Sequence, residues 1–217
     1  IISRPYIDMT LAIMRLFGAQ AQWNSEREIR VEAVPYSPTP YYIEGDWSAA
    51  SYWYEMVALS GDSEAKVVLP GLFRDSLQGD SAVSELFSQL GVTTTFNKNS
   101  VCLTKRACGS EPFVCNMLNQ PDLAQTIVVT CCMLGIHFRI SGLQTLRIKE
   151  TDRIEALRTQ LLKMGYVLSV GEDLSMSWDG TKCEPLDEIR IDTFDDHRMA
   201  MAFAPASVKF PGIIIND

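Results

Sequence analysis

The stretch Lys149-Glu150-Thr151-Asp152-Arg153 carries residue types suited to both anion binding and proton transfer. It precedes an amphipathic helical pattern. If that helix begins by Lys149, then Lys149, Glu150 and Arg153 share one surface at its start, because residues three and four apart are neighbours on a helix. Two cations beside a carboxylate can hold an anion and still move protons. An exposed helix start with ordinary ion pairs, worth little energy, explains the same spacing, and spacing alone favours it.

A second cluster of charge is Asp195-Asp196-His197-Arg198, at the start of another predicted helix. One aspartate can cap that helix, whereas cations in a first turn lie at the unfavourable end of the helix dipole. A bound anion would offset this cost, and the neighbouring aspartates would serve equally well. The residues alone leave these two interpretations open.

Asp122 follows Pro121 at the start of a third predicted helix. A helix cap is the commoner role for an aspartate in this position. A carboxylate at a helix start facing a cleft can instead act as a general base.

The elements that must position these residues alternate between helix and strand. A helix is predicted from Pro5 to about Gly18, then a strand over residues 28–34, and then a proline-rich break that suggests a hinge or a domain crossing. Beyond the break, helices are predicted to begin near Asp46, Asp122 and Asp195.

The glycine-containing turns and the strands that accompany these helices recur as well. Pro70-Gly71-Leu72 resembles Ser141-Gly142-Leu143, and Leu90-Gly91 resembles Met164-Gly165, each glycine suiting a left-handed position. Strands are predicted over 92–96, 101–104, 167–170 and 174–178, with another over 188–191. The fold class predicted is therefore α/β (α+β), built from a β-α-β-α-β-β unit present twice and a third unit begun near residue 188. The helices starting near Asp122 and Asp195 occupy equivalent positions in successive units. Their N-termini are therefore expected to point the same way, and they could converge on an anion.

Composition narrows the function classes. The net charge of −8 over 217 residues argues against a broad nucleic-acid surface, although local cations can still hold a small anion. No apolar run is long enough to span a bilayer and no secretory signal is visible, so we expect no membrane association.

The six cysteines form no C-x-x-C pair, and only His137 and His197 could join them as metal ligands. We therefore expect reduced cytosolic thiols and no metal site. The start at Ile1 and the strand-like run at the end suggest a piece of a longer polypeptide.

Several ordered segments together resemble the EPSP synthase (3-phosphoshikimate 1-carboxyvinyltransferase) family. One K-E-T-D-R match would be modest, but six segments in the family's order displace the ordinary interpretations above. The segments are Ile2-Ser3-Arg4-Pro5-Tyr6-Ile7-Asp8-Met9-Thr10-Leu11, Glu44-Gly45-Asp46-Trp47-Ser48-Ala49-Ala50-Ser51-Tyr52, Gln78-Gly79-Asp80, Pro121-Asp122, Lys149-Glu150-Thr151-Asp152-Arg153 and Asp196-His197-Arg198-Met199-Ala200-Met201.

The resemblance implies transfer of the enolpyruvyl group of phosphoenolpyruvate to the 5-hydroxyl of shikimate 3-phosphate, with release of phosphate and without a cofactor or metal. A base must take the hydroxyl proton and an acid must protonate the methylene carbon, and both transfers reverse during elimination. The resemblance assigns the first role to Asp122 and the second to Glu150. The implied substrate contacts are Lys149 between both substrates, Arg153 and Arg198 on phosphoenolpyruvate, His197 supporting Glu150 or Arg198, and Ser3 and Tyr6 lining the shikimate 3-phosphate pocket. Thr145 stands where the family has an asparagine.

The implied fold is the enolpyruvyl transferase fold, with two domains that close on the substrates. Residues 1–43 would end the substrate-side domain, and residues 44–217 would form a C-terminal domain that is truncated at its end. The earlier binding elements of the first half and a late lysine would then lie outside this chain, so the isolated chain is expected to have no appreciable activity. The full-length protein is expected to be cytoplasmic and monomeric.

Two alternatives remain. The related transferase that acts on UDP-N-acetylglucosamine shares the fold and chemistry but lacks this K-E-T-D-R context. A non-catalytic binding module of the same fold is the other, and the retained carboxylates and cations argue against it.

Overall fold

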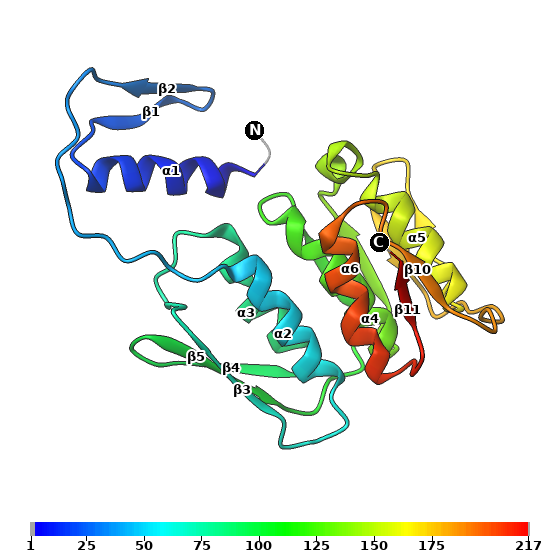
Figure 1. Cartoon of the computed structure of the whole chain (residues 1–217). Helices are drawn as coiled ribbons and strands as arrows, with labels where there is room; N and C mark the ends of the chain where they lie inside the picture. Colours follow the sequence, from blue (N-terminus) through cyan, green and yellow to red (C-terminus); the bar gives the residue numbers. More distant parts are fainter. Residues whose placement is uncertain (1–2, 217) are drawn as a thin grey trace.

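The computed structural model describes residues 3–216, so that Ile1, Ile2 and Asp217, three residues of the predicted segments, lie outside it. The chain begins with helix α1 (Arg4–Leu16), which has Pro5 in its first turn as predicted. A hairpin of β1 (Ala21–Ser25) and β2 (Glu28–Val31) follows, with β1 not anticipated from the sequence. Residues 32–46 contain no helix or strand and lead to the remaining elements (Figure 1).

The first repeat contains α2 (Trp47–Leu59), β3 (Lys66–Pro70), the short helix η1 (Gly79–Ala82), α3 (Val83–Gln89), β4 (Val92–Phe96) and β5 (Ser100–Lys105). Its strands form a sheet in the order β3-β5-β4 with both pairings antiparallel. Helix α2 starts as the sequence predicts, because the Asp46 side chain accepts a hydrogen bond from the Ser48 N–H and caps it.

The second repeat contains β6 (Phe113–Asn116), η2 (Pro121–Leu123), α4 (Ala124–Leu134), β7 (Phe138–Ser141), η3 (Gln144–Ile148), α5 (Arg153–Lys163), β8 (Ser169–Val170) and β9 (Met176–Trp178). Its sheet order is β6-β7-β9-β8, with β6 and β7 parallel. The third repeat begins with β10 (Arg190–Asp192), α6 (His197–Phe203), η4 (Ala204–Val208) and β11 (Ile214–Asn216), the two strands pairing in parallel.

The predicted repeat is confirmed by these pairings. The β7-β9-β8 part of the second sheet has the order and the antiparallel pairing of β3-β5-β4 in the first. The matched glycines also agree: φ is +78° at Gly71 and +77° at Gly142, and +85° at Gly91 and +90° at Gly165. All four therefore adopt the left-handed conformation that glycine permits at low cost.

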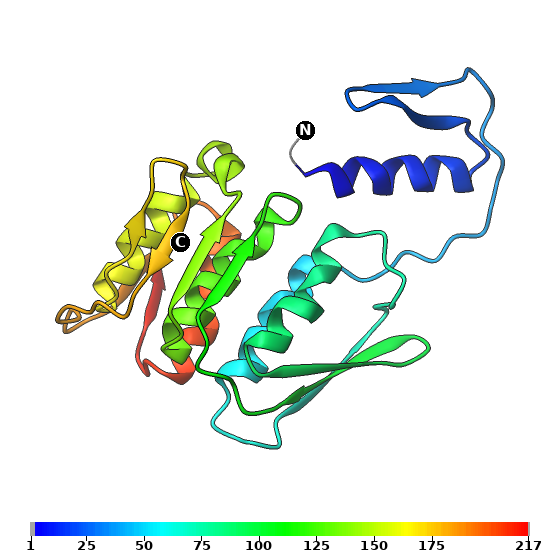
Figure 2. The same cartoon turned by 180° about the vertical axis from the view of Figure 1, so that it is seen from behind.

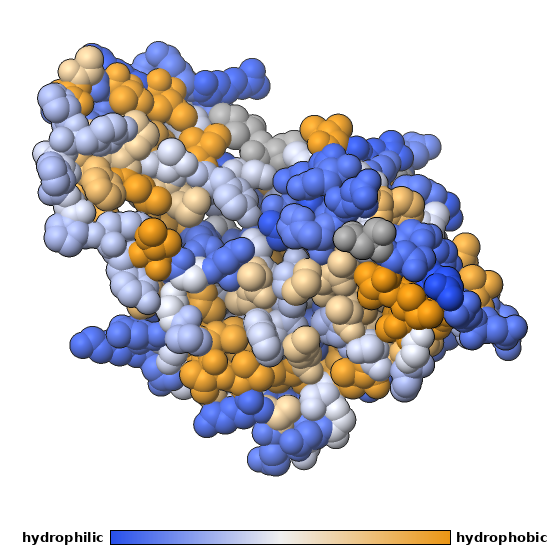
Figure 3. Space-filling view, in the orientation of Figure 1, coloured by the Kyte–Doolittle hydropathy of each residue, from blue (hydrophilic) through white to orange (hydrophobic). Residues whose placement is uncertain are grey.

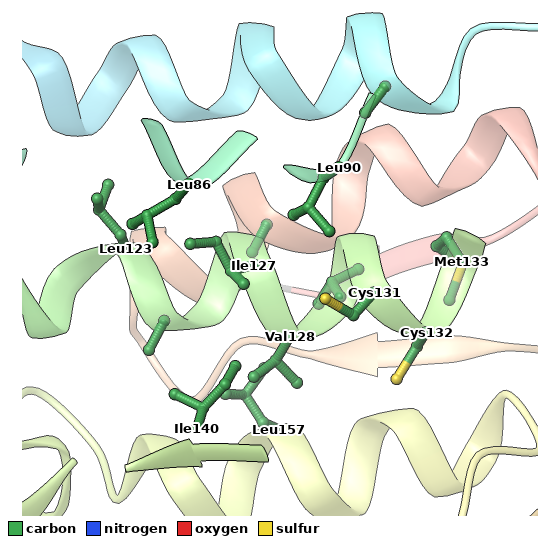
Figure 4. Close-up of a cluster of buried hydrophobic side chains, with 14 of the residues drawn as sticks. Leu86, Leu90, Leu123, Ile127, Val128, Cys131, Cys132, Met133, Ile140 and Leu157 are labelled. Carbon is green, nitrogen blue, oxygen red and sulfur yellow. The ribbon is translucent and has the colours of Figure 1, made fainter. Parts of the chain in front are cut away.

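The core surrounds α4, whose residues from Ala124 to Met133 are all buried. Figure 4 shows its side chains between Leu86 and Leu90 on one side and Ile140 and Leu157 on the other. Burying a residue such as Leu157 contributes roughly 1.5–3 kcal/mol. Seen from behind, the sheet of the second repeat lies in front of α4 and α6 (Figure 2). The elements whose starts carry the chemical residues are therefore fixed by one continuous core.

The condition that a helix begins by Lys149 is not met, because this helix begins at Arg153, with Asp152 as its cap. The helix predicted near Asp195 begins at His197 and is capped by Asp196, with His197 and Arg198 in its first turn as predicted. Across the described range, no helix has the length and apolar character needed to cross a bilayer.

Candidate active site

The Asp122 carboxylate lies at the centre of a cluster of cations that come from the starts of α5 and α6 and from the turn before α5. Lys149 Nζ lies 3.2 Å and Arg153 Nη1 3.1 Å from Asp122 Oδ1, while Arg198 Nη2 lies 3.4 Å from Oδ2. Asp122 makes no side-chain cap for the helical turn that contains it or for α4, so the capping interpretation is wrong. Burial alone would raise the pKa of Asp122, but Arg198, Lys149 and Arg153 outweigh that effect and hold the pKa below its ordinary value.

Arg153, the first residue of α5, is buried within this cluster, with its side chain 1% exposed. Its Nε and Nη2 donate to Asp196 at 2.7 and 3.2 Å, and Nη2 also donates to Glu150 Oε2 at 2.7 Å. With its amide oxygen turned toward the guanidinium, Gln125 accepts from Nε at 3.0 Å and from Nη1 at 3.2 Å. These partners and Asp122 engage all three nitrogens of the guanidinium, which carries five N–H groups. Without displacing a partner, a ligand would find little of this guanidinium to bind.

Asp196 joins the buried arginine to the start of α6. Its carboxylate is fully buried, and Oδ1 accepts the Arg198 backbone N–H at 3.0 Å while it also contacts Arg153. The two preceding residues, Phe194 and Asp195, have φ values of +57° and +58°, which are strained for residues with a side chain. The turn into α6 therefore stores strain where it delivers Asp196 and Arg198 to the cluster.

Lys149 and Glu150 lie between η3 and α5 rather than in a helix. Even so, the predicted proximity of Lys149, Glu150 and Arg153 is found, because the turn brings Lys149 and Arg153 to the same oxygen of Asp122. Glu150 is 48% exposed and Lys149 31% exposed. These two side chains remain accessible to a ligand.

Ser3 and Tyr6 approach from α1. The Ser3 backbone N–H donates to the Leu118 carbonyl at 3.2 Å, and the Tyr6 hydroxyl donates to Asp80 Oδ1 at 2.9 Å. Burial, and then the Asp80 carboxylate, raise the pKa of Tyr6. Tyr6 and Arg198 line the same cavity of about 600 Å³, which lies between α1, the 41–46 segment and the 73–78 loop.

Two sequence-predicted positions stand apart from the charge cluster. His197 is exposed, and within residues 3–216 its ring makes no hydrogen bond or ion pair with Glu150 or Arg198. The Thr145 hydroxyl is buried in η3 with no hydrogen-bond partner in the part of the chain that is described. In this arrangement, therefore, no hydrogen bond or ion pair supports the predicted role of His197 beside Glu150 or Arg198.

Sequence reasoning missed three residues that organise the site. Asp196 was recognised only as an alternative cap, Gln125 had no distinguishing signal, and Asp80 was part of a resembling segment without a role. All three side chains are at most 1% exposed. Buried polar residues inside an otherwise apolar element are the signal that could have found Gln125, since such groups need partners.

The cluster balances three cations, Lys149, Arg153 and Arg198, against three carboxylates, Asp122, Glu150 and Asp196. An incoming anion would compete with these carboxylates for the cations, and Asp122, whose pKa the cations lower, would become more basic when they are drawn away. The arrangement can therefore couple anion binding to proton transfer.

Comparisons with known proteins identify the family to which this sequence is similar. The family model described as EPSP synthase (3-phosphoshikimate 1-carboxyvinyltransferase) matches residues 1–217. A 3-phosphoshikimate 1-carboxyvinyltransferase from Bacteroides fragilis is 49% identical over 217 residues, which cover 100% of this chain and 52% of the relative. One from Idiomarina loihiensis is 35% identical, covering 100% of this chain and 49% of the relative. The chain thus spans about half the length of these curated relatives.

The fold is found in solved structures as well. An EPSP synthase from Acinetobacter baumannii has a TM-score of 0.69 at 20% identity, over 94% of this chain and 48% of that one. The enolpyruvyl transferase NikO from Streptomyces tendae has a TM-score of 0.54 at 15% identity, over 97% and 47%. At these identities the likeness establishes the enolpyruvyl transferase fold alone.

Proposed function

This chain belongs to the EPSP synthase family, and we propose that it supplies the proton-transfer half of an enzyme that transfers enolpyruvyl from phosphoenolpyruvate to the 5-hydroxyl of shikimate 3-phosphate. The observation that carries the proposal is the convergence of Lys149, Arg153 and Arg198 on Asp122, with Glu150 on the same arginine. Cations next to carboxylates suit a reaction between two phosphorylated substrates that moves a proton twice.

The reaction is an addition followed by an elimination. In the addition, Asp122 takes the proton of the 5-hydroxyl while the hydroxyl oxygen bonds to C2 of phosphoenolpyruvate. Glu150 gives a proton to the methylene carbon. In the elimination, Glu150 takes back a methyl proton as the C–O bond to phosphate breaks, and Asp122 returns its proton to the departing phosphate, so that both carboxyl groups regain their starting states. Asp122 is ionised at neutral pH because its pKa is held low, so it is ready to accept a proton.

A low pKa also makes a carboxylate a weak base. Phosphoenolpyruvate resolves this conflict, because its negative groups would draw Arg198 and Lys149 away from Asp122 and raise the pKa of Asp122. Arg198 and Lys149, with side chains 19% and 31% exposed, are the cations open to such a ligand.

Arg153 binds the ligand by exchange. Its side chain is 1% exposed, and Glu150, at 48%, is the one accessible carboxylate among its partners. The ligand carboxylate or phosphate takes the place of Glu150 on Nη2, which leaves Glu150 free to face the methylene carbon. One displacement thus places the ligand and activates the acid.

The remaining assignments follow from the family. Residues 1–43 end the substrate-side domain and residues 44–217 belong to the C-terminal domain. Ser3 and Tyr6 line the shikimate 3-phosphate pocket, and His197 supports Glu150 or Arg198 through a contact that forms when the substrates bind. The intact protein acts as a cytoplasmic monomer. The family match favours this reaction over transfer to UDP-N-acetylglucosamine.

Phosphate release tests the proposal. The intact protein that contains this chain is assayed with phosphoenolpyruvate and shikimate 3-phosphate, beside the 217-residue chain alone. Turnover by the intact protein and none by the isolated chain are expected, because cations of the other half are needed for both substrates. Turnover with UDP-N-acetylglucosamine instead, or binding without turnover, would replace this function with one of the two alternatives.

A further inference from the structure

Gln78-Gly79-Asp80 is one of the six segments that resemble the EPSP synthase family, and the resemblance gives it no role. The segment contacts the end of the 32–46 segment, the start of α2 and the start of α1. Gln78 Nε2 donates to the Gly45 carbonyl at 2.7 Å, and Gln78 Oε1 accepts the Trp47 N–H at 2.9 Å. Gln78 thereby holds the end of the 32–46 segment to the start of α2. The next two residues contact α1.

Asp80 is a buried carboxylate, 1% exposed, that forms no ion pair among residues 3–216, although the charge of Arg198 acts on it. Its Oδ1 accepts the Tyr6 hydroxyl of α1 at 2.9 Å, and its Oδ2 accepts the Ser48 hydroxyl from the first turn of α2. Burying a polar group without hydrogen-bond partners is costly, so these two hydroxyls must be held in place to satisfy it. The carboxylate therefore ties α1 to α2.

Gly79 allows this approach. A Cβ at position 79 would lie 2.9 Å from Pro5 Cβ and 3.3 Å from the Asn119 carbonyl oxygen. The first turn of α1 thus rests directly on the backbone at Gly79. Among residues 3–216, the Tyr6 bond to Asp80 and the Ser3 N–H bond to Leu118 are the hydrogen bonds that join residues 3–43 to the rest of the chain, whereas others, such as Trp23 Nε1 to Asp8 Oδ1 at 2.6 Å, stay within residues 3–43.

The position of this contact gives it a functional meaning. Tyr6, Ser48 and Arg198 all line the cavity of about 600 Å³, so the distance across it from Tyr6 to the charge cluster depends on how α1 is seated. Apolar side chains of residues 16–43, including Leu16, Tyr36 and Ile43, are exposed, which shows that the rest of the chain leaves much of this N-terminal part uncovered (Figure 3). The few polar contacts at the start of α1 therefore carry much of its placement.

We propose that Asp80 is a positioning residue that latches α1 to α2 through the Tyr6 and Ser48 hydroxyls and so sets the gap between Tyr6 and Arg198. The consequence of this latch rests on the proposed function: a correctly seated α1 places shikimate 3-phosphate against Asp122. Asp80 acts through Tyr6 and does not touch the reacting atoms.

Two measurements on the intact protein that contains this chain test the latch. Hydrogen exchange over residues 4–16, without ligand, reports the seating of α1, and the KM for shikimate 3-phosphate reports its consequence. Tyr6→Phe and Asp80→Ala should each raise exchange in α1 and raise KM about tenfold or more, as expected for a lost hydrogen bond to a carboxylate. The kcat should change far less than KM. The double variant should be no worse than Asp80→Ala, because Asp80→Ala already removes the bond that Tyr6→Phe breaks.

Asp80→Asn, which keeps an acceptor for Tyr6, should restore most of the exchange protection. Tyr54→Phe is the matched control, because it removes a tyrosine hydroxyl bonded to Thr94 Oγ1 at 2.9 Å away from α1 and should leave both readouts unchanged. Unchanged exchange in Asp80→Ala, or effects of the two changes that multiply, would overturn the latch. If no turnover occurs at all, the proposed function fails, and the exchange measurement still decides whether the latch exists.

Discussion

The Arg153 guanidinium and the Asp196 carboxylate form a two-point ion pair that joins the start of α5 to the start of α6. Nε to Oδ2 is 2.7 Å and Nη2 to Oδ1 is 3.2 Å, and the two side chains are 1% and 0% exposed. The pair explains why segments 43 residues apart in sequence deliver their charges to one point.

Asp196→Ala should destabilise the fold by about 3–5 kcal/mol, because it leaves Arg153 buried with less compensation and removes the cap of α6. Urea unfolding of the chain measures this. The control is Glu155→Ala, which breaks the exposed pair with Arg158 at 2.6 Å and should cost less than about 1 kcal/mol. Equal losses in the two variants would contradict the structural role given to Asp196.

Glu55 of α2 should make stability depend on pH. It is fully buried, its carboxylate oxygens make no hydrogen bond of good geometry within the described chain, and the Thr130 hydroxyl opposes the effect of burial only in part. Burial raises the pKa of Glu55 well above its usual 4.5. The folded state therefore keeps a proton that the unfolded state loses, so stability falls as pH rises from about 4.5 toward the folded-state pKa, by up to about 1.4 kcal/mol per pH unit.

Glu55→Gln removes this titration and keeps the shape of the side chain. The variant should gain stability over the unchanged chain at pH 8, and the gain should shrink toward pH 5, as measured by urea unfolding at both values. A gain of the same size at both pH values would show that Glu55 does not carry a buried proton.

Gly142, directly after β7, should not tolerate a side chain. Its φ is +77°, and a Cβ there would lie 2.5 Å from the Leu118 backbone nitrogen and also meet the Asn116 side chain. Gly142→Ala should cost more than about 1 kcal/mol, since strain and clash add. Gly61→Ala, with nothing within 4 Å of its Cβ, is the matched control and should be nearly neutral in thermal unfolding. Similar melting temperatures for both variants would contradict the tight turn at Gly142.

The sequence predicted the repeat and most of its elements because local signals suffice for them. Asp46 caps α2 as expected, and Gly71 and Gly142 take the same left-handed turn. Spacing left open whether the helix begins by Lys149, and in the structure Lys149 lies in a turn before α5 because Asp152 caps that helix. Which carboxylate serves which arginine depends on contacts between distant segments. Spacing within one segment therefore could not assign Asp196 to Arg153 or Tyr6 to Asp80.

The most direct test of the account is the rate of phosphate release from phosphoenolpyruvate by the intact protein, with and without shikimate 3-phosphate, for Asp122→Asn and Glu150→Gln. Both changes keep side-chain shape and remove a proton-transfer group. We expect release that requires shikimate 3-phosphate and a kcat that falls about 10²–10⁴-fold in each variant, with unfolding little changed in Glu150→Gln. Release that does not need shikimate 3-phosphate, or an undiminished kcat in both variants, would contradict it.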